Sequence, residues 1–251
     1  MNKLALLFAS ASLLIFISGC SSFMDPVPKN VFMIKKYNEG NKNNATSITG
    51  GVLSVETTKS LGLNAVEKYL GIRLLPDEVQ FDVTVVDLNA LKELVEHDIR
   101  QDEKQNAEES LKEVPEGLFY LTITSPNNER YELVLNAGTG DVLKISNEPQ
   151  MREVSGGIPS DKTVNSHSEI TNKFLQEKEA LNPRDFQEDG GLFVEDKKIA
   201  YYCFRSIKDN SLKYVIEIDL AKNKITGFNK DIMALLTWNA KVSVKMPSMQ
   251  E

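Results

Sequence analysis

The chain has 251 residues, with 36 acidic and 29 basic side chains and a net charge of −7. Its hydrophobic content of 41% is too high for a disordered tail and too low for a protein with several membrane spans. The acidic balance argues against sequence-independent binding of nucleic acid, because neutralising phosphates takes clustered Lys and Arg. The length allows one large domain or two small ones.

The first 19 residues have the pattern of a secretory signal. Lys3 supplies a positive start, and the apolar run over 4–17 is too short to cross roughly 30 Å of hydrocarbon comfortably. Residues 17–20 then resemble the lipobox of bacterial lipoproteins: an aliphatic residue, two small residues and a Cys that receives diacylglycerol. The resemblance implies cleavage before Cys20 and an acyl anchor on Cys20 in the lipid bilayer. The alternatives are an ordinary signal peptide with an incidental Cys, or a buried N-terminal helix.

Cysteine usage agrees with export. If Cys20 is acylated, Cys203 is the one thiol left, so no internal disulfide can form. Cys203 lies in an aromatic, strand-like run, where a buried inert thiol is expected rather than a nucleophile. A catalytic Cys would need a base, and the mature chain offers only His97 and His167. Ser21 fits outer-membrane sorting in a Gram-negative cell and plain membrane anchoring in a Gram-positive cell.

An internal repeat is the most informative feature of the chain. Residues 117–147 and 200–230 align without a gap at an offset of 200 − 117 = 83, and each predicts three strands joined by polar turns. A helix is predicted before each meander, over 58–70 and 166–181, and a further strand lies between, at 81–85 and 192–194. The fold class is therefore α+β, with two repeated units that each pack a helix on an antiparallel meander. The expected core residues are Phe119, Leu121, Leu133 and Leu135 in the first unit, and Phe204, Ile216 and Ile218 in the second.

These patterns divide the mature chain into a lipidated N-terminus and tether (20–51), a first unit (52–147), a linker (148–164) and a second unit (165–251). The first unit carries a helical insertion over 89–116, whose apolar face is interrupted by a polar stretch at 100–106. A last strand is predicted near the C-terminus, with lysines suited to an exposed edge. Its alternating apolar residues are Trp238, Ala240, Val242, Val244 and Met246.

The second and third strands of the first meander are joined by the turn Asn-Ala-Gly-Thr-Gly-Asp at 136–141. This hairpin resembles the signature of PepSY-type modules of secreted bacterial proteins. The second copy is degenerate, and Asn223 stands where Gly140 would adopt a left-handed conformation. The resemblance implies non-catalytic modules found in protease propeptides and envelope proteins, where control of a peptidase has been proposed. The helical insertion is not part of that pattern.

Few residue groups suggest catalysis or metal binding. Glu93 and His97 are four apart on one helix face and could share a divalent ion, but a zinc site needs three or four ligands. Ser166, His167 and Glu169 combine a hydroxyl, an imidazole and a carboxylate, yet neighbours at a helix start cannot form a triad. A capping box explains them better. No nucleotide-binding glycine motif occurs, so we expect no catalytic residue, cofactor or metal.

The stretch 93–116 holds nine carboxylates against Arg100, Lys104 and Lys112. A solvated face is the default interpretation, and a docking arm for a basic partner is the rival. We expect a membrane-anchored extracytoplasmic lipoprotein, not an enzyme, that binds or regulates an envelope protein such as a peptidase or cell-wall enzyme. The alternative is a receptor for a small ligand or a cation, held in the groove between the two units.

Overall fold

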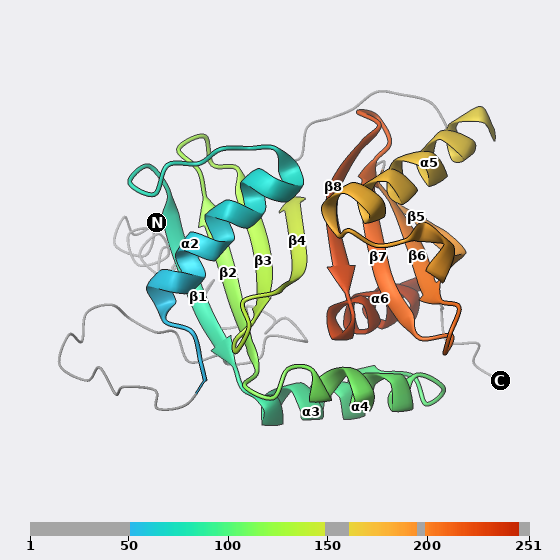
Figure 1. Ribbon diagram of the computed structural model, residues 1–251, viewed down its shortest axis with the longest axis horizontal. Helices are drawn as coiled ribbons and strands as arrows, with labels where there is room; N and C mark the ends of the chain where they lie inside the picture. The colour runs from blue at the N-terminus through green and yellow to red at the C-terminus, as the bar shows by residue number, and fades with distance from the viewer. Residues whose placement is uncertain (1–50, 149–160, 195–198, 246–251) are drawn as a thin grey trace, which may run out of the picture. The chain divides into compact units, whose positions relative to one another are not determined.

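The computed structural model describes residues 51–148, 161–194 and 199–245 (Figure 1). Within these ranges the chain is α+β, as expected, and builds one antiparallel sheet of eight strands. The predicted signal peptide, Cys20, the tether up to residue 50 and residues 149–160 of the linker lie outside the described residues. None of the helices in the described part is both long and apolar enough to cross a membrane.

The sheet has the strand order β1-β2-β3-β4-β8-β7-β6-β5, so each unit contributes four consecutive strands. The strands are β1 (Gln80–Val86), β2 (Leu118–Thr124), β3 (Arg130–Asn136), β4 (Val142–Glu148), β5 (Phe186–Val194), β6 (Ile199–Ser206), β7 (Leu212–Asp219) and β8 (Lys224–Lys230). The helices are α2 (Val55–Ala65), which continues as the π-helical turn η1 (Val66–Leu70), α3 (Leu88–Asp98), α4 (Lys104–Lys112), α5 (Asp161–Lys178), the short 3₁₀ turn η2 (Pro183–Asp185) and α6 (Ile232–Lys245).

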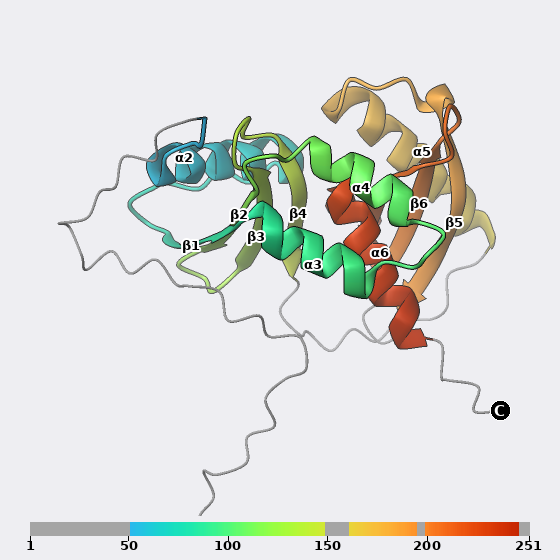
Figure 2. The same cartoon turned by 90° about the horizontal axis from the view of Figure 1, so that it is seen from below.

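Helices cover both faces of the sheet. On one face α2, η1 and α5 pack over a core that contains all seven residues predicted for it, each of which is buried. On the other face α3, α4 and α6 cover a second core (Figures 1 and 2). Alternation along the strands produces both cores, because successive side chains point to opposite faces of a sheet.

The repeat is confirmed in the register of the sheet. Leu133 pairs with Ile145 in the first unit, and Ile216 pairs with Phe228 in the second. The offsets 216 − 133 and 228 − 145 both equal 83, the value found in the sequence. Both ladders also shift register at the equivalent step. The shift lies between residues 134 and 135 in the first unit and between residues 217 and 218 in the second.

The first strand of each meander departs from that offset. Ile123 pairs with Tyr131, whereas Phe204 pairs with Tyr214, so β2 and β6 are related by 204 − 123 = 81. Counted between these pairs, the β6–β7 hairpin holds two more residues than the β2–β3 hairpin, and its ladder shifts register after Phe204. The gapless alignment was wrong there. Because a shift of two keeps each side chain on its face, the core prediction was still correct.

The turn that carries the PepSY-like resemblance has the same architecture in both copies. Asn136 Oδ1 accepts hydrogen bonds from the backbone N–H groups two and three residues later, at 2.9 and 3.2 Å. Asp219 Oδ1 does the same at 2.9 and 3.0 Å. Gly140 has a φ of +80°, and Asn223 takes the left-handed conformation at +51°, as predicted. The side chains of Leu61 and Leu53 lie against Gly140, so a Cβ at residue 140 would be crowded as well as strained.

The two units join through β4 and β8, around a local two-fold axis. The register pairs are Lys144↔Asn229, Ile145↔Phe228 and Ser146↔Gly227. Since 145 + 83 = 228, the central pair joins equivalent residues of the two units. The two flanking pairs are equivalent to each other, because 144 + 83 = 227 and 146 + 83 = 229. The units therefore associate as the protomers of an isologous dimer would, within one chain.

A buried carboxylate lies beside this junction. Glu217 is 7% exposed, and its two oxygens accept hydrogen bonds from Thr226 of the same unit at 3.0 Å and Ser146 of the other unit at 3.5 Å. Burial raises the pKa of the Glu217 carboxyl, and the hydrogen bonds and the nearby Lys144 and Lys241 offset this only in part.

We expect Glu217→Gln to stabilise the protein at neutral pH. The folded state holds the Glu217 proton more tightly than the unfolded state, so the wild type loses stability as pH rises from the unfolded pKa through the folded one. Below about pH 4.5 both states are protonated and the two proteins should unfold alike. Urea denaturation from pH 4 to 8 measures the difference, whose plateau is about 1.4 kcal/mol for each pH unit of displacement. A constant difference at every pH would contradict this account, and Glu93→Gln on exposed α3 is the control.

The predicted C-terminal strand is wrong, because residues 232–245 form α6. Ile232, Leu235 and Asn239 are buried at helical spacing, whereas Ala240, expected on the same strand face as Trp238, is exposed. The alternation over 238–246 was local, and the helical periodicity that decides the structure begins six residues earlier. Met246 lies outside the described residues.

Helix α5 begins at Asp161, five residues before the predicted start. Ser166 therefore lies inside the helix, and the capping-box interpretation of Ser166 and Glu169 was wrong. The sequence upstream continues as helix without a break, so Ser-x-x-Glu there is not a helix boundary.

Candidate binding site

The insertion in the first unit folds as a helical hairpin of α3 and α4, which we call the helical arm (residues 88–116). Its two helices are separated between Asp98 and Lys104, within the polar stretch predicted to interrupt them. The inner face of the arm packs on α6 of the second unit (Figure 2). The residues in this contact region include Leu91, Val95, Ile99, Ala107 and Leu111 of the arm and Ile232, Met233 and Leu235 of α6.

The tip of the arm is tied to the second unit by a buried ion pair. Arg205 Nη2 lies 2.6 Å from a carboxylate oxygen of Glu103, and these side chains are only 15% and 10% exposed. Arg205 Nε also lies 2.6 Å from Asp189. The backbone N–H of Arg100 donates to Oδ1 of Asn239 in α6 at 3.3 Å. The arm is thus part of the folded core of both units.

Of the acidic side chains in the arm, one is buried and has a structural role, and the others are exposed to solvent. Glu103 is buried and pairs with Arg205. The other eight carboxylates of the stretch are exposed: Glu93, Glu96, Asp98, Asp102, Glu108, Glu109, Glu113 and Glu116. The outer face of the arm is therefore solvated and acidic, and it is accessible to a partner.

A groove of about 620 Å³ runs between α3 and α4 on the arm. Its walls and floor include the apolar residues Leu88, Val95, Leu111 and Pro115, and charged side chains stand among them: Lys92, Glu96, Lys104, Glu108 and Lys112. The volume lies within the range of binding pockets, and apolar surface with a few placed charges is typical of such sites. No residue of α6 lines the groove. This groove is the candidate binding site.

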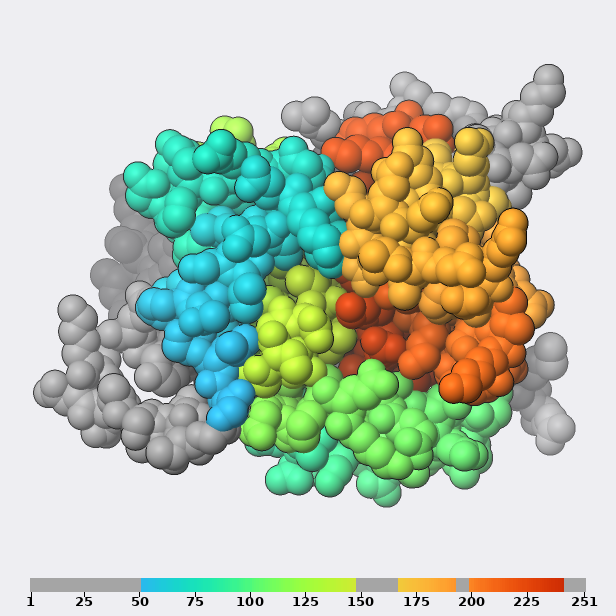
Figure 3. All heavy atoms as spheres, in the orientation of Figure 1, coloured from blue at the N-terminus to red at the C-terminus, as the bar shows by residue number. Residues whose placement is uncertain are grey.

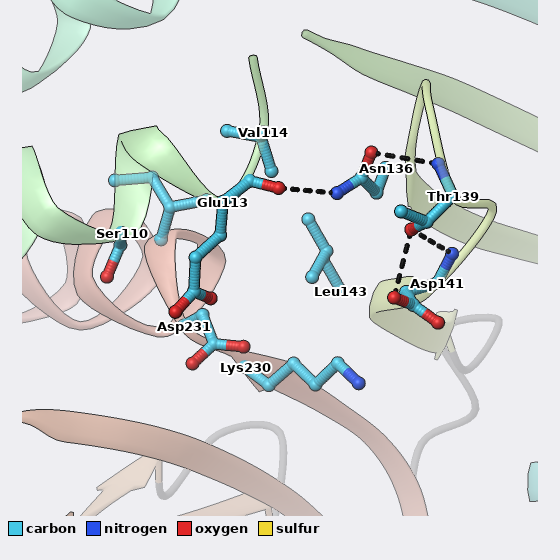
Figure 4. Close-up of a pocket in the computed structure, with 10 residues that line it drawn as sticks. Ser110, Glu113, Val114, Asn136, Thr139, Asp141, Leu143, Lys230 and Asp231 are labelled. Carbon is cyan, nitrogen blue, oxygen red and sulfur yellow. Dashed lines mark hydrogen bonds between the residues drawn. The ribbon is translucent and has the colours of Figure 1, made fainter. Parts of the chain in front are cut away.

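A second, smaller hollow of about 120 Å³ lies where the arm meets the β3–β4 turn and the end of β8 (Figures 3 and 4). Asn136 Nδ2 donates to the carbonyl of Glu113 at 2.8 Å on one side, and Lys230 and Asp231 lie on the other. Asp231 is paired with Lys213 at 3.1 Å, and Lys230 lies 3.3 Å from Glu179. This hollow is where the alternative function would place a small ligand or a cation.

The residues considered for chemistry do not assemble. Glu93 and His97 are exposed on α3. Cys203 is buried, as predicted, and burial raises the pKa of its thiol. His167 is buried with Nδ1 3.1 Å from the hydroxyl of Tyr202, and burial lowers its pKa. Within the described ranges, no three His, Cys, Asp or Glu side chains come close enough together to hold a metal ion.

The groove was not predicted from the sequence, although a signal for it exists. Lys92 and Glu96 on α3 are four residues apart, as are Lys104, Glu108 and Lys112 on α4. Charges at this spacing line one face of a helix beside its apolar stripe. What the sequence does not contain is the antiparallel packing that brings the two faces together.

No protein-family model and no curated protein matches this sequence. Two solved structures are similar in fold. One is the Bacillus megaterium YpeB C-terminal domain, at 12% identity and a TM-score of 0.45, covering 80% of this chain and 70% of that one. The other is a protein of unknown function from Clostridium leptum, at 12% identity and a TM-score of 0.40, covering 78% of this chain and 99% of that one. At this identity and these scores, neither likeness bears on function.

Proposed function

We propose that the mature chain is a membrane-anchored extracytoplasmic lipoprotein that binds another envelope protein through the helical arm and performs no chemistry itself. The observation that carries this proposal is the groove between α3 and α4, an apolar hollow of about 620 Å³ on an otherwise acidic and solvated surface. Apolar surface rimmed by polar residues marks interaction sites on soluble domains.

The N-terminal residues support the anchor. The positive start, the short apolar run and the lipobox-like residues 17–20 together favour acylation of Cys20. Each acyl methylene buried in the bilayer contributes about 0.8 kcal/mol, so a diacylated Cys would hold the protein on the membrane. The polar stretch 20–51 would then act as a tether for the folded part.

The placement of the titratable side chains supports a non-catalytic role. Cys203 is buried and protonated, and His167 is buried beside Tyr202, so neither offers a reactive atom at the surface. The PepSY-like hairpin, with its turn repeated at Asn136 and Asp219, suggests a peptidase or cell-wall enzyme as the class of partner.

Photo-cross-linking in intact cells tests this function. A photoreactive residue at Lys92, which lines the groove, should capture one dominant envelope protein, whereas the same residue at neighbouring Glu93 should capture much less. Cys20→Ala should abolish anchoring and capture, and Cys203→Ala should preserve both. Equal capture at the two positions, or self-cross-links alone, would contradict the proposal. Deleting the arm is not a clean test, because its inner face belongs to the core.

A second candidate function, a receptor for a cation or small ligand, would use the small hollow at the junction, which is lined by Lys230 together with Glu113, Asp141 and Asp231. We expect no rise in melting temperature with Ca²⁺, Mg²⁺ or Zn²⁺, since Lys213 already neutralises Asp231. A bound ion at 100-fold over its Kd would add about 2.7 kcal/mol of stability. Such a shift, abolished by Asp141→Asn, would favour the receptor instead.

A further inference from the structure

The groove on the arm has the layout of a helix-packing site. Val95 of α3 and Leu111 of α4 line the groove and also belong to the core that the arm shares with α6. Helix α6 contacts both helices of the hairpin, so the pair already packs against a third helix. Val95 and Leu111 are only 5% and 6% exposed and form the floor of the groove, so a second helix would also contact the more exposed Leu88 and Pro115.

The charges along the groove alternate in sign. On α4, Lys104, Glu108 and Lys112 follow one another at intervals of four residues, which is about 6 Å along a helix axis. On α3, Lys92 and Glu96 are spaced in the same way. The walls thus present three positive and two negative charges, of which Lys112 already pairs with Glu109 of its own helix, and the groove itself is less acidic than the outer face of the arm.

We infer that the groove receives an amphipathic α-helix of the partner, with an apolar stripe and with Glu and Lys alternating along its flanks in the order opposite to the walls. This inference rests on the proposed function, and it names the chemistry of the partner at that site. A helix anchored at i, i+3, i+4 and i+7 is a recurrent way to fill a groove of this kind. Flanking charges then fix its register and direction, as they do in coiled coils.

Other occupants fit the walls less well. An extended strand needs free backbone N–H and C=O groups to pair with, and the groove walls are helices whose backbone groups bond within each helix. A purely basic segment would meet Lys92, Lys104 and Lys112 at close range. Lys112 already pairs with Glu109 at 2.5 Å, and a lipid chain would leave the other four wall charges without a complement.

Synthetic helices binding to the lipidated full chain in nanodiscs test the inference. A first peptide carries a Leu stripe flanked by Glu-Lys-Glu and Glu-Lys, which complements the walls. A second exchanges every Glu and Lys, and a third has Lys at all flanking positions. By fluorescence anisotropy, the first should bind about tenfold or more tightly than the second, because each wall charge changes from attraction to repulsion. The third should bind more weakly than the first.

Two variants on one helix give the matched control. Glu96→Lys, on the groove wall, should weaken the first peptide severalfold, and Glu93→Lys, with the same charge change off the groove, should not. Changing the peptide Lys that faces residue 96 to Glu should restore binding to the Glu96→Lys protein.

Equal binding of the first two peptides, preference for the all-Lys peptide, or equal effects of the two variants would overturn the inference. Such a result would leave the proposed function standing if Lys92 still captures a partner in cells. Conversely, selective peptide binding without capture in cells would count against the function, and not against the chemistry of the groove.

Discussion

Replacing Gly227 by alanine should lower the free energy of unfolding by about 3 kcal/mol, at the upper end of the cost of overpacking. A Cβ at residue 227 would overlap the backbone oxygen of Ile145 and lie 2.9 Å from the Cα of Ser146. Both are backbone atoms of β4, so no side-chain rotation can relieve the clash. The two strands would have to separate at the junction that joins the units.

Urea denaturation of Gly227→Ala measures this cost, and Gly138→Ala is the matched control. A Cβ at residue 138 would find its nearest neighbour, a side-chain atom of Glu116, at 3.4 Å, so that variant should lose little stability. Calorimetry should also show a broader or divided unfolding transition in Gly227→Ala than in the wild type, because the units lose their shared strand pair. Equal stability of the two variants would mean that β4 and β8 do not approach as closely as described.

The repeated meanders could be predicted because each strand carries its own signal. Alternation placed Leu133 and Leu135 of β3 on the core face, and the same pattern recurred 83 residues later at Ile216 and Ile218 of β7. Even the two-residue difference in β6 did no harm to the core, since it preserves the face. The helix α6 was missed because a period of two over Trp238 to Val244 competed with helical spacing that starts at Ile232.

The parts that escaped prediction depend on contacts between distant residues. The sequence predicted a helical insertion whose apolar face is interrupted at residues 100–106, but not that it would fold into two helices that pack on one another and enclose a groove. It also gave no reason to distinguish Glu103 from the eight other carboxylates around it. That distinction arises only because Arg205, 102 residues away, meets the tip of the arm.

Two ion pairs at the tip of the arm should therefore differ widely in their contribution to stability. Arg100 and Asp102 lie 2.6 Å apart and are 55% and 60% exposed, while Arg205 and Glu103 lie at the same distance and are 15% and 10% exposed. Arg205→Met should cost about 3 kcal/mol of unfolding free energy, because it leaves the Glu103 carboxylate buried without its counter-ion. Arg100→Met should cost at most about 0.5 kcal/mol, since water screens the exposed pair.

A double variant separates the lost ion pair from lost packing. Glu103→Leu combined with Arg205→Met removes both buried charges, and the exposed Asp189 returns to water, so the double variant should recover most of the stability lost in Arg205→Met. Urea denaturation of the wild type, Arg205→Met, Arg100→Met and the double variant measures these differences. If Arg205→Met and Arg100→Met lower the free energy of unfolding equally, the buried Glu103–Arg205 pair is not what holds the arm on the second unit.

If Arg205→Met lowers that free energy more, as expected, this variant should also weaken cross-linking of the partner from Lys92, because the helices of the arm form both walls of the groove.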